Sequence, residues 1–408
     1  DYYASRGLGD VYKRQFYNSM NLSHIPANIK NSSFPLTRIN PQHVEGIQKG
    51  IPLFDGVGIK DIAFITKRFE TLNLFRGCNL GCSHCLKDAK PLKNGTILFE
   101  DLVRFLDGFK ALNERLGFNV FQGNKYVNII DDSNPSDIPI RGKSRNHSVN
   151  EALKMIYEKI NLPSIFVTSG WNSASKYSQQ NSEELAGMIE KKPDFVKSVE
   201  VSINPFSGIM EKSREALREN NQSRAEFFRN VYTDRMANAL KVFLKLFGTG
   251  KASIIYRHAP DYKGNELVGE SETRRLYEEI YSKLEKMTGS ALENIPYLRP
   301  ENLTSFDKSH LIESSGRGRR FFPQDRNLKE QQELIDEALE LEMMSPDERS
   351  KELLDCAVKC VDIDGKVYAT MPASKVEYIS APIELTVPTN IRLNYENKSA
   401  VPPVFSDI

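Results

Sequence analysis

The sequence predicts an α/β protein in which parallel strands alternate with helices. Between residues 69 and 290, short apolar runs with strand character alternate with longer segments of helical periodicity. Repeated β–α units give parallel strands joined by right-handed crossovers. A chain of 408 residues accommodates one large domain of this kind with extensions, or two domains. About five or six such units fit either a partial barrel or an open doubly wound sheet, and periodicity does not choose between them.

The individual elements follow in chain order. Residues 16–60 are polar with scattered Pro and Gly, which predicts an irregular lead-in, and the apolar run 61–66 predicts a first hairpin strand. Residues 69–75 alternate apolar and polar side chains as a strand does, and apolar residues recur at helical spacing over 98–116. Further strands are predicted at 126–130, 164–168, 199–203 and 252–256, and further helices at 149–160, 182–191, 224–247 and 270–287.

The C-terminal part departs from this alternation. Residues 294–322 are rich in turn residues, and 328–354 form a strongly charged predicted helix. A short hairpin is predicted at 361–370 around Asp364-Gly365, and the last thirty residues, with four prolines, are expected to be extended.

Composition sets the broad class. Hydrophobic residues make up 39% and charged residues 27%, which is ordinary for a soluble globular protein, and the formal net charge is +1. This balance gives no electrostatic reason to expect a nucleic-acid or membrane partner. No apolar run approaches the roughly 20 residues that span a bilayer, and no signal peptide is evident. Five cysteines in so long a chain are not a disulfide framework, so we expect a cytoplasmic protein.

The first residues stand apart from the rest. Residues 1–15 lack an initiator Met, and the run from Gly7 to Gln15 resembles translated sequencing-adapter read-through; the alternative is a natural disordered start. In either case we expect no chemistry there. The predicted organisation is a start segment (1–15), a lead-in (16–66), an α/β domain (67–322) and a C-terminal extension (323–408).

Three of the five cysteines form a C-x3-C-x2-C motif directly after the predicted strand 69–75. Cys78, Cys82 and Cys85 suit three corners of an iron–sulfur cube, whose irons are held by thiolates. Three ligands leave one iron open to a small molecule, which predicts an enzyme. The alternative is a zinc site with His84 as the fourth ligand. Zinc sites usually take their ligands from two separated pairs of residues, and a histidine between adjacent ligand positions would strain a tetrahedral site.

The motif and its place in the chain resemble the radical S-adenosylmethionine (radical SAM) superfamily, over roughly residues 69–290. The resemblance implies a partial (β/α)6 TIM-like barrel with one [4Fe-4S] cluster. It also implies S-adenosyl-L-methionine on the open iron, reductive cleavage of that cofactor, and hydrogen abstraction from substrate by the resulting radical. An electron donor such as flavodoxin or ferredoxin and a small-molecule or peptide substrate are the implied partners. No individual catalytic residue is implied.

The same resemblance assigns cofactor contacts near the first two strand ends. His84 stands where the family usually has an aromatic residue near the adenine; the alternative is a solvent-facing histidine. The turn 131–135 stands where the family has a Gly-Gly-Glu-Pro-like segment that meets the methionine ammonium. Asp132 and Ser133 can accept hydrogen bonds from an ammonium, or the turn merely caps the next segment.

Three later strand ends carry further candidates. Ser169 stands in the family's Thr-Asn-Gly position, and Ser202 and Asn204 share one strand face where a polar pair often meets the ribose. For all three the alternative is ordinary turn chemistry. Arg257 is placed to meet a carboxylate or else is simply exposed, and Trp171 either lines the substrate site or is buried packing.

The C-terminal extension adds a second resemblance, to peptide-modifying members with a SPASM-like extension. The segment 314–319 is similar to their Gly-Arg segment, and Cys356 and Cys360 precede a Gly-x-Val-Tyr hairpin as auxiliary-cluster ligands do. No further cysteine follows, and two thiolates do not complete a four-cysteine site. We therefore expect a degenerate extension, with two reduced thiols that would share one face on a helix. A peptide or protein maturase is one alternative function, and a non-catalytic metal-binding or electron-transfer protein is the other.

Overall fold

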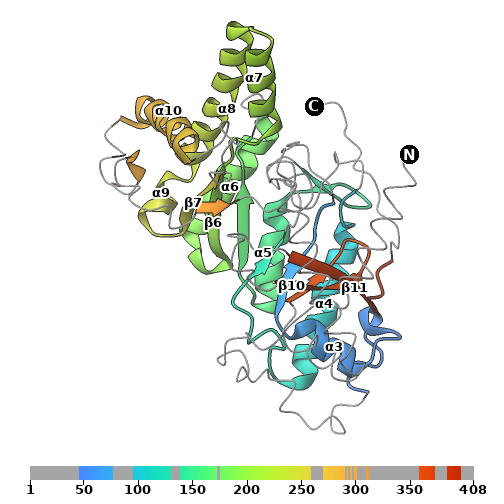
Figure 1. Ribbon diagram of the computed structural model, residues 1–408. Coiled ribbons are helices and arrows are strands. Elements are labelled where there is room, and N and C mark those ends of the chain that lie inside the picture. Colours follow the sequence, from blue (N-terminus) through green and yellow to red (C-terminus); the bar gives the residue numbers. More distant parts are fainter. Residues whose placement is uncertain are drawn as a thin grey trace, which may run out of the picture.

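The structure is a computed structural model in which one large, mostly parallel sheet forms the centre of the molecule (Figure 1). Nine strands pair in the order β11-β10-β9-β1-β2-β5-β6-β7-β8, and β3 and β4 form a separate hairpin. The described residues are 46–76, 95–129, 138–171, 175–258, 270–289, 292, 295, 298–300, 309–311, 358–372 and 384–396.

The sheet divides into a parallel part and a C-terminal part. All strands from β1 to β8 in the sheet are parallel to their neighbours, β9 is parallel to β1, and β10 and β11 are antiparallel additions. The strands are β1 (Phe69–Leu72), β2 (Val127–Asn128), β3 (Ile140–Arg141), β4 (Asn146–His147), β5 (Ser164–Thr168), β6 (Val196–Ile203), β7 (Ala252–His258), β8 (Ser309–Leu311), β9 (Val358–Val361), β10 (Lys366–Pro372) and β11 (Glu384–Arg392).

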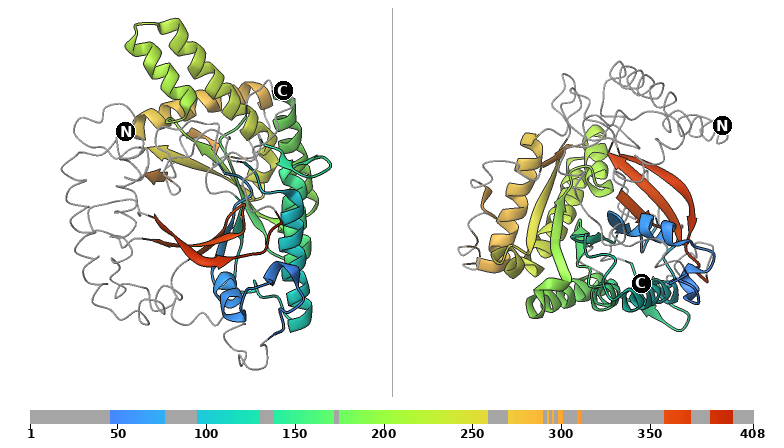
Figure 2. Two further views of the ribbon diagram at one scale, coloured as in Figure 1. Left: turned by 90° about the vertical axis from the view of Figure 1, so that its right-hand side faces the viewer. Right: turned by 90° about the horizontal axis from the view of Figure 1, so that it is seen from below.

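Strand order bears on the two architectures left open by the sequence. From β1 to β8 the order in space follows the order in the chain and never reverses, whereas a doubly wound sheet requires a reversal. Sequential right-handed crossovers place the helices on one face, and Figure 2 shows α10 and the green and teal helices following one another along one side of the sheet. The edges β8 and β11 do not pair with each other in the described residues.

Polar caps begin most of the helices that cover this face. Ser148, Ser175, Ser207 and Asn221 each accept a hydrogen bond from a backbone N–H of the first turn of α5, α6, α7 or α8. The helices are η3 (Pro52–Phe54), α3 (Ile59–Thr66), α4 (Phe99–Leu116), α5 (Val149–Ile160), α6 (Lys176–Lys191), η5 (Pro193–Phe195), α7 (Gly208–Arg218), α8 (Gln222–Val242), α9 (Leu244–Gly248) and α10 (Glu270–Thr288).

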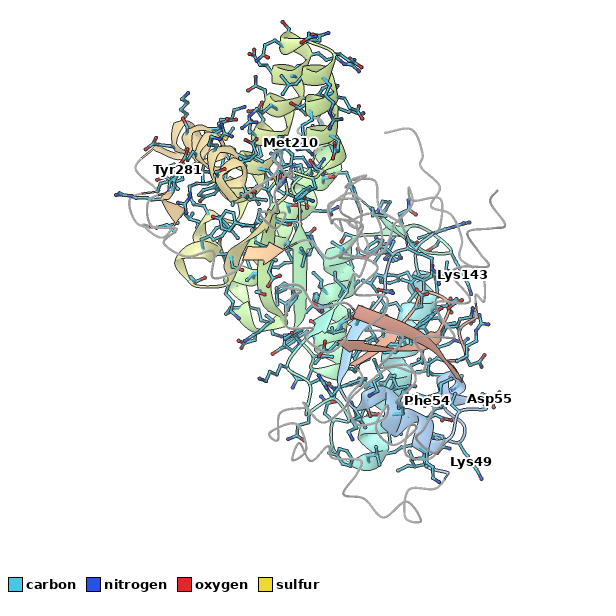
Figure 3. All side chains as sticks on the ribbon, in the orientation of Figure 1. Lys49, Phe54, Asp55, Lys143, Met210 and Tyr281 are labelled. Atoms are coloured by element: carbon cyan, nitrogen blue, oxygen red, sulfur yellow. The ribbon has the colours of Figure 1, made fainter. Side chains whose placement is uncertain are left out.

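Aromatic side chains fill the space between sheet and helices. Phe69 of β1 packs against Phe105 of α4, with ring centroids 6.0 Å apart, and Phe166 of β5 lies 6.3 Å from Phe243. The α7–α8 pair stands out from this body at the top of Figure 1, and Met210, in the first turn of α7, lies at the base of this pair (Figure 3). Among the described residues, no helix is both long and apolar enough to cross a membrane.

Most predicted elements of the α/β domain are confirmed, and in the lead-in the strand predicted at 61–66 is wrong. The segment 61–66 belongs to helix α3, because Ile62 and Ile65 are buried at helical spacing and Asp61 accepts a hydrogen bond from Gly58 N–H at the helix start. The lead-in is therefore partly helical. The predicted helix 224–247 is two helices, α8 and α9. The helix predicted at 328–354 lies outside the described residues.

The C-terminal hairpin is confirmed. Strands β9 and β10 pair in antiparallel fashion around Asp364-Gly365, and Gly365 has φ +79°, which favours glycine at this turn. The tail expected to be extended contributes β11, which tolerates Pro388 because the strand lies at the sheet edge.

Candidate functional site

The candidate site lies at the carboxyl ends of the parallel strands, and it begins at the end of β1. The segment 77–94, which contains the C-x3-C-x2-C motif, is held at both ends: Arg76 N–H donates to Gly95 O at 3.0 Å, and Phe75 forms an antiparallel bridge with Thr96. The chain therefore leaves and returns at the carboxyl end of β1.

Six predicted site residues lie outside the described residues. They are Cys78, Cys82, His84 and Cys85, in segment 77–94, and Asp132 and Ser133, in segment 130–137. The start of the second segment is anchored, because Leu74 N–H donates to Ile129 O at 3.1 Å. Both segments therefore leave the sheet at neighbouring strand ends.

The end of β5 carries Ser169, and helix α8 holds this turn from behind. The Arg235 guanidinium is largely buried, and it donates to Ser169 O at 3.1 Å and to Gly170 O at 2.6 Å. Gly170 has φ +70°, and a Cβ there would lie 2.9 Å from Arg235 Cγ, so only glycine fits. Thr168 Oγ1 accepts from Gly170 N–H at 3.1 Å. The turn is fixed by buried polar contacts.

Trp171 follows this turn and is a packing residue. Its side chain is buried, and its ring meets that of Phe243 edge-on with centroids 6.4 Å apart. Of the two interpretations of the only tryptophan, the structure confirms the packing one.

The end of β6 carries Ser202 and Asn204, both buried. Asn204 Oδ1 accepts from Phe206 N–H at 3.0 Å, and Asn204 N–H donates to the Tyr232 hydroxyl of α8 at 2.6 Å. Asn204 therefore takes part in the turn chemistry that was its alternative interpretation, and its cofactor contact stays a prediction. Ser202 lies in register with Ile255 of β7.

Two further observations concern β7 and the middle of the sheet. Arg257 lies near the carboxyl end of β7, in register with His310 of β8. Toward the other end of the strands, burial raises the pKa of the Tyr126 phenol, and the carboxylates of Glu70 and Glu200 raise it further.

The C-terminal hairpin reaches the same edge, beside the end of β1, which sequence reasoning did not predict. Cys360 lies in strand β9 rather than on a helix, and its buried thiol Sγ accepts from Asn73 Nδ2 at 3.4 Å. The Arg76 guanidinium forms an ion pair with the Asp362 carboxylate. Burial alone would lower the pKa of Arg76, but the carboxylate of Asp362 outweighs it and the pKa is raised. Cys356 lies outside the described residues.

These observations bear on where a metal or cofactor would bind. Among the described residues, no group of three or more His, Cys, Asp or Glu side chains is arranged to hold a metal. The donor set that fits an iron–sulfur cluster is the three thiols of segment 77–94. Two cavities of about 760 and 460 Å³, at the lead-in and between α5 and α6, include no predicted site residue.

Comparison with models of known protein families finds no match, and a search of curated proteins finds no matching relative.

Proposed function

We propose that this protein is a radical SAM enzyme that binds a [4Fe-4S] cluster through Cys78, Cys82 and Cys85. One observation carries the proposal: the segment with the C-x3-C-x2-C motif is anchored at the carboxyl end of β1, the first of six parallel strands in sequential order. Active sites of β/α barrels gather at this end of the strands.

The partial (β/α)6 barrel is part of the same proposal. Six parallel strands, β1-β2-β5-β6-β7-β8, follow one another in space as they do in the chain, and an open barrel has this order. The edge strand β8 then marks the open side. Strand β9 extends the same sheet at the other edge of β1, so the edge strands of the nine-stranded sheet are β8 and β11.

When bound, the cluster and S-adenosyl-L-methionine would supply the electron and the radical. The residues of this chain hold and orient them. Three thiolates hold the metal, and the proposed contacts of the second cofactor are made by His84, Asp132, Ser133, Ser169 and Ser202. Asn204 belongs to the same proposed set, and its side-chain oxygen also accepts from Phe206 N–H. Ser169, Ser202 and Asn204 are buried on that side of the site.

The substrate is a small molecule or a peptide, and the electron donor is a flavodoxin- or ferredoxin-like protein. The maturase alternative is favoured by one observation, the antiparallel β9–β10 hairpin with its Asp364-Gly365 turn, which is similar to the start of a SPASM-like extension. Such an extension without its cluster would serve a structural purpose.

Anaerobic reconstitution with iron and sulfide tests the proposal. The protein should bind about four irons per chain, and it should cleave S-adenosyl-L-methionine under dithionite. The Cys78→Ala, Cys82→Ala, Cys85→Ala triple variant should lose both properties. The matched control, Cys356→Ala with Cys360→Ala, should keep the iron content.

A colourless protein that binds zinc would contradict the proposal. A reconstituted cluster that never cleaves the cofactor would favour the electron-transfer alternative instead. Loss of about four irons in the control variant would show a second cluster in the extension.

A further inference from the structure

The C-terminal hairpin is docked at the base of the cysteine segment. Strand β9 extends the sheet at the free edge of β1, with Lys359 N–H donating to Arg68 O at 2.9 Å and Asn73 N–H donating to Val361 O at 2.8 Å. The turn of the hairpin thus lies beside the carboxyl end of β1.

Charged side chains join the end of β1 to the C-terminal hairpin. The Arg76 guanidinium pairs with Asp362, and Asp364 Oδ1 lies 4.0 Å from the same guanidinium. The two aspartate side chains are each 9% exposed, whereas Arg76 is 33% exposed. Asn73 Nδ2 lies 3.5 Å from Asp362 Oδ1. Asp364 also lies 3.8 Å from Lys366 and from Arg392, so Asp362 is the carboxylate that pairs most closely with Arg76.

The hairpin turn fixes these carboxylates. Asp362 Oδ1 accepts from Ile363 N–H at 2.8 Å, and Asp364 Oδ1 accepts from Lys366 N–H at 3.1 Å. Gly365 N–H donates to Asp362 O at 2.9 Å. Because each carboxylate is bound to its own turn, the hairpin presents both in one orientation.

Arg76 is adjacent to the proposed metal ligands. It precedes Cys78 by two residues, and two residues of chain span at most roughly 7 Å. We therefore expect a charge at Arg76 to act on a metal bound to Cys78, because the reduction potential of an iron–sulfur cluster depends on nearby charge and hydrogen bonding.

We propose that Asp362 is a positioning residue: it holds Arg76, and through Arg76 the base of segment 77–94, and it neutralises the guanidinium charge beside the metal. The inference rests on the proposed function only for the identity of that metal. The C-terminal hairpin then fixes the cysteine segment and does not bind a second cluster.

The proposal predicts opposite electrostatic effects from the two halves of the pair. Asp362→Asn leaves the guanidinium charge less compensated, so the midpoint potential of the reconstituted cluster should rise. Arg76→Gln leaves the Asp362 carboxylate without its ion pair, while Asp364 keeps Lys366 and Arg392 at 3.8 Å, so the potential should fall. A purely structural contact would not produce shifts of opposite sign.

Redox titration of the reconstituted protein, followed by the electron paramagnetic resonance signal of the reduced cluster, measures these shifts. Arg229→Gln is the matched control, because Arg229 pairs with Glu272 and Glu279 between α8 and α10 and is 28% exposed. It should leave the potential unchanged. Equal potentials in all variants, or shifts of one sign for Asp362→Asn and Arg76→Gln, would overturn the proposal.

Hydrogen exchange of the metal-free protein tests the same contact without a cluster. In Asp362→Asn the amides of Asn73 and Arg76 should exchange about ten- to hundred-fold faster than in wild type, the loss expected for a hydrogen bond to a charged group. Arg229→Gln should leave them unchanged. Slow exchange at both amides in Asp362→Asn would overturn the positioning role. If the wild-type protein binds no iron but these amides still exchange faster in Asp362→Asn than in wild type, only the proposed function is overturned.

Discussion

Two regions of the carboxyl edge of the sheet are held in different ways. The turns after β5 and β6 are held by α8, whose Arg235 and Tyr232 lie three residues apart and bind the backbone at Ser169 and Asn204. The end of β1 is held by Asp362, which is 286 positions away from Arg76 in the chain. The turns after β5 and β6 therefore depend on their own and the next β–α unit, whereas the end of β1 depends on the C-terminal extension.

This difference has a consequence for stability. Contacts between neighbouring β–α units form within the cooperative core, whereas the hairpin docks across a long chain separation whose closure costs entropy. Elements added at a sheet edge open at lower free energy than central strands. We therefore expect the β9–β11 region to open before the β5–β6 region.

The largest expected effect is on the turn after β5. In Arg235→Met the carbonyls of Ser169 and Gly170 lose their donor, and a buried group left without its partner costs about 1–3 kcal/mol. We expect a loss of about 2–4 kcal/mol in the free energy of unfolding, measured by urea titration. Arg218→Met, at an exposed position of α7, is the control and should cost under about 0.5 kcal/mol. Equal losses in both variants would show that α8 does not fix this turn.

A smaller effect is expected at the hairpin, where two glycines form a matched pair. Gly365 has φ +79°, and a Cβ there would lie 2.6 Å from Leu393 O; Gly250 has φ +72° with nothing within 4 Å. Alanine at either position incurs the left-handed backbone strain of about 1–2 kcal/mol, and only Gly365→Ala adds a collision with backbone. Gly365→Ala should therefore be the more destabilising, by about 1–3 kcal/mol.

Hydrogen exchange locates that effect. Gly365→Ala should speed exchange in β9 and β10 while leaving β5 and β6 as in wild type, because the hairpin is an addition to the sheet edge. Uniformly faster exchange in both regions would mean that the hairpin and the core unfold as one unit, which would remove the distinction between the two regions.

The same comparison explains what the sequence could predict. Helix α5 and strand β5 have the predicted bounds, because Ser148 caps the helix, Asn161 ends it in a left-handed conformation, and the strand is a short apolar run. These signals are local. The docking of β9 on β1 leaves no periodic signal in either strand, since it depends on a pairing between distant segments.

The missed elements have similar causes. Helix α7 has a cap at Ser207, but its polar composition hides the apolar spacing of Met210 and Ala216. Strand β11 contains Pro388, which argues against a central strand and is tolerated at an edge. At the candidate site, residue type alone did not reveal that Asn204 Oδ1 is occupied by the backbone.

The smallest expected effect concerns the end of the C-terminal extension. Glu396 pairs with Arg104 of α4 and with Lys143, whose Nζ lies 2.5 Å from the Glu396 carboxylate. Lys143 lies on the side of the molecule that carries β10 and β11 (Figure 3). Hydrogen bonding from Lys143, followed by that from Arg104, lowers the pKa of Glu396. A carboxylate whose pKa is lowered on folding contributes stability above its unfolded pKa, and this contribution is lost as pH falls through the folded pKa.

Glu396→Gln should therefore reduce stability slightly near neutral pH and leave it unchanged well below the ordinary glutamate pKa of 4.5. The effect is small because the group is exposed and water screens the charges. Thermal unfolding of wild type and variant from about pH 3 to about pH 7 measures this stability difference, because carboxylates titrate within that range. Glu158→Gln, at the exposed (i, i+4) pair with Lys154 in α5, is the control within the core region. A pH-independent difference for Glu396→Gln would show that the ion pair does not tie the extension to α4.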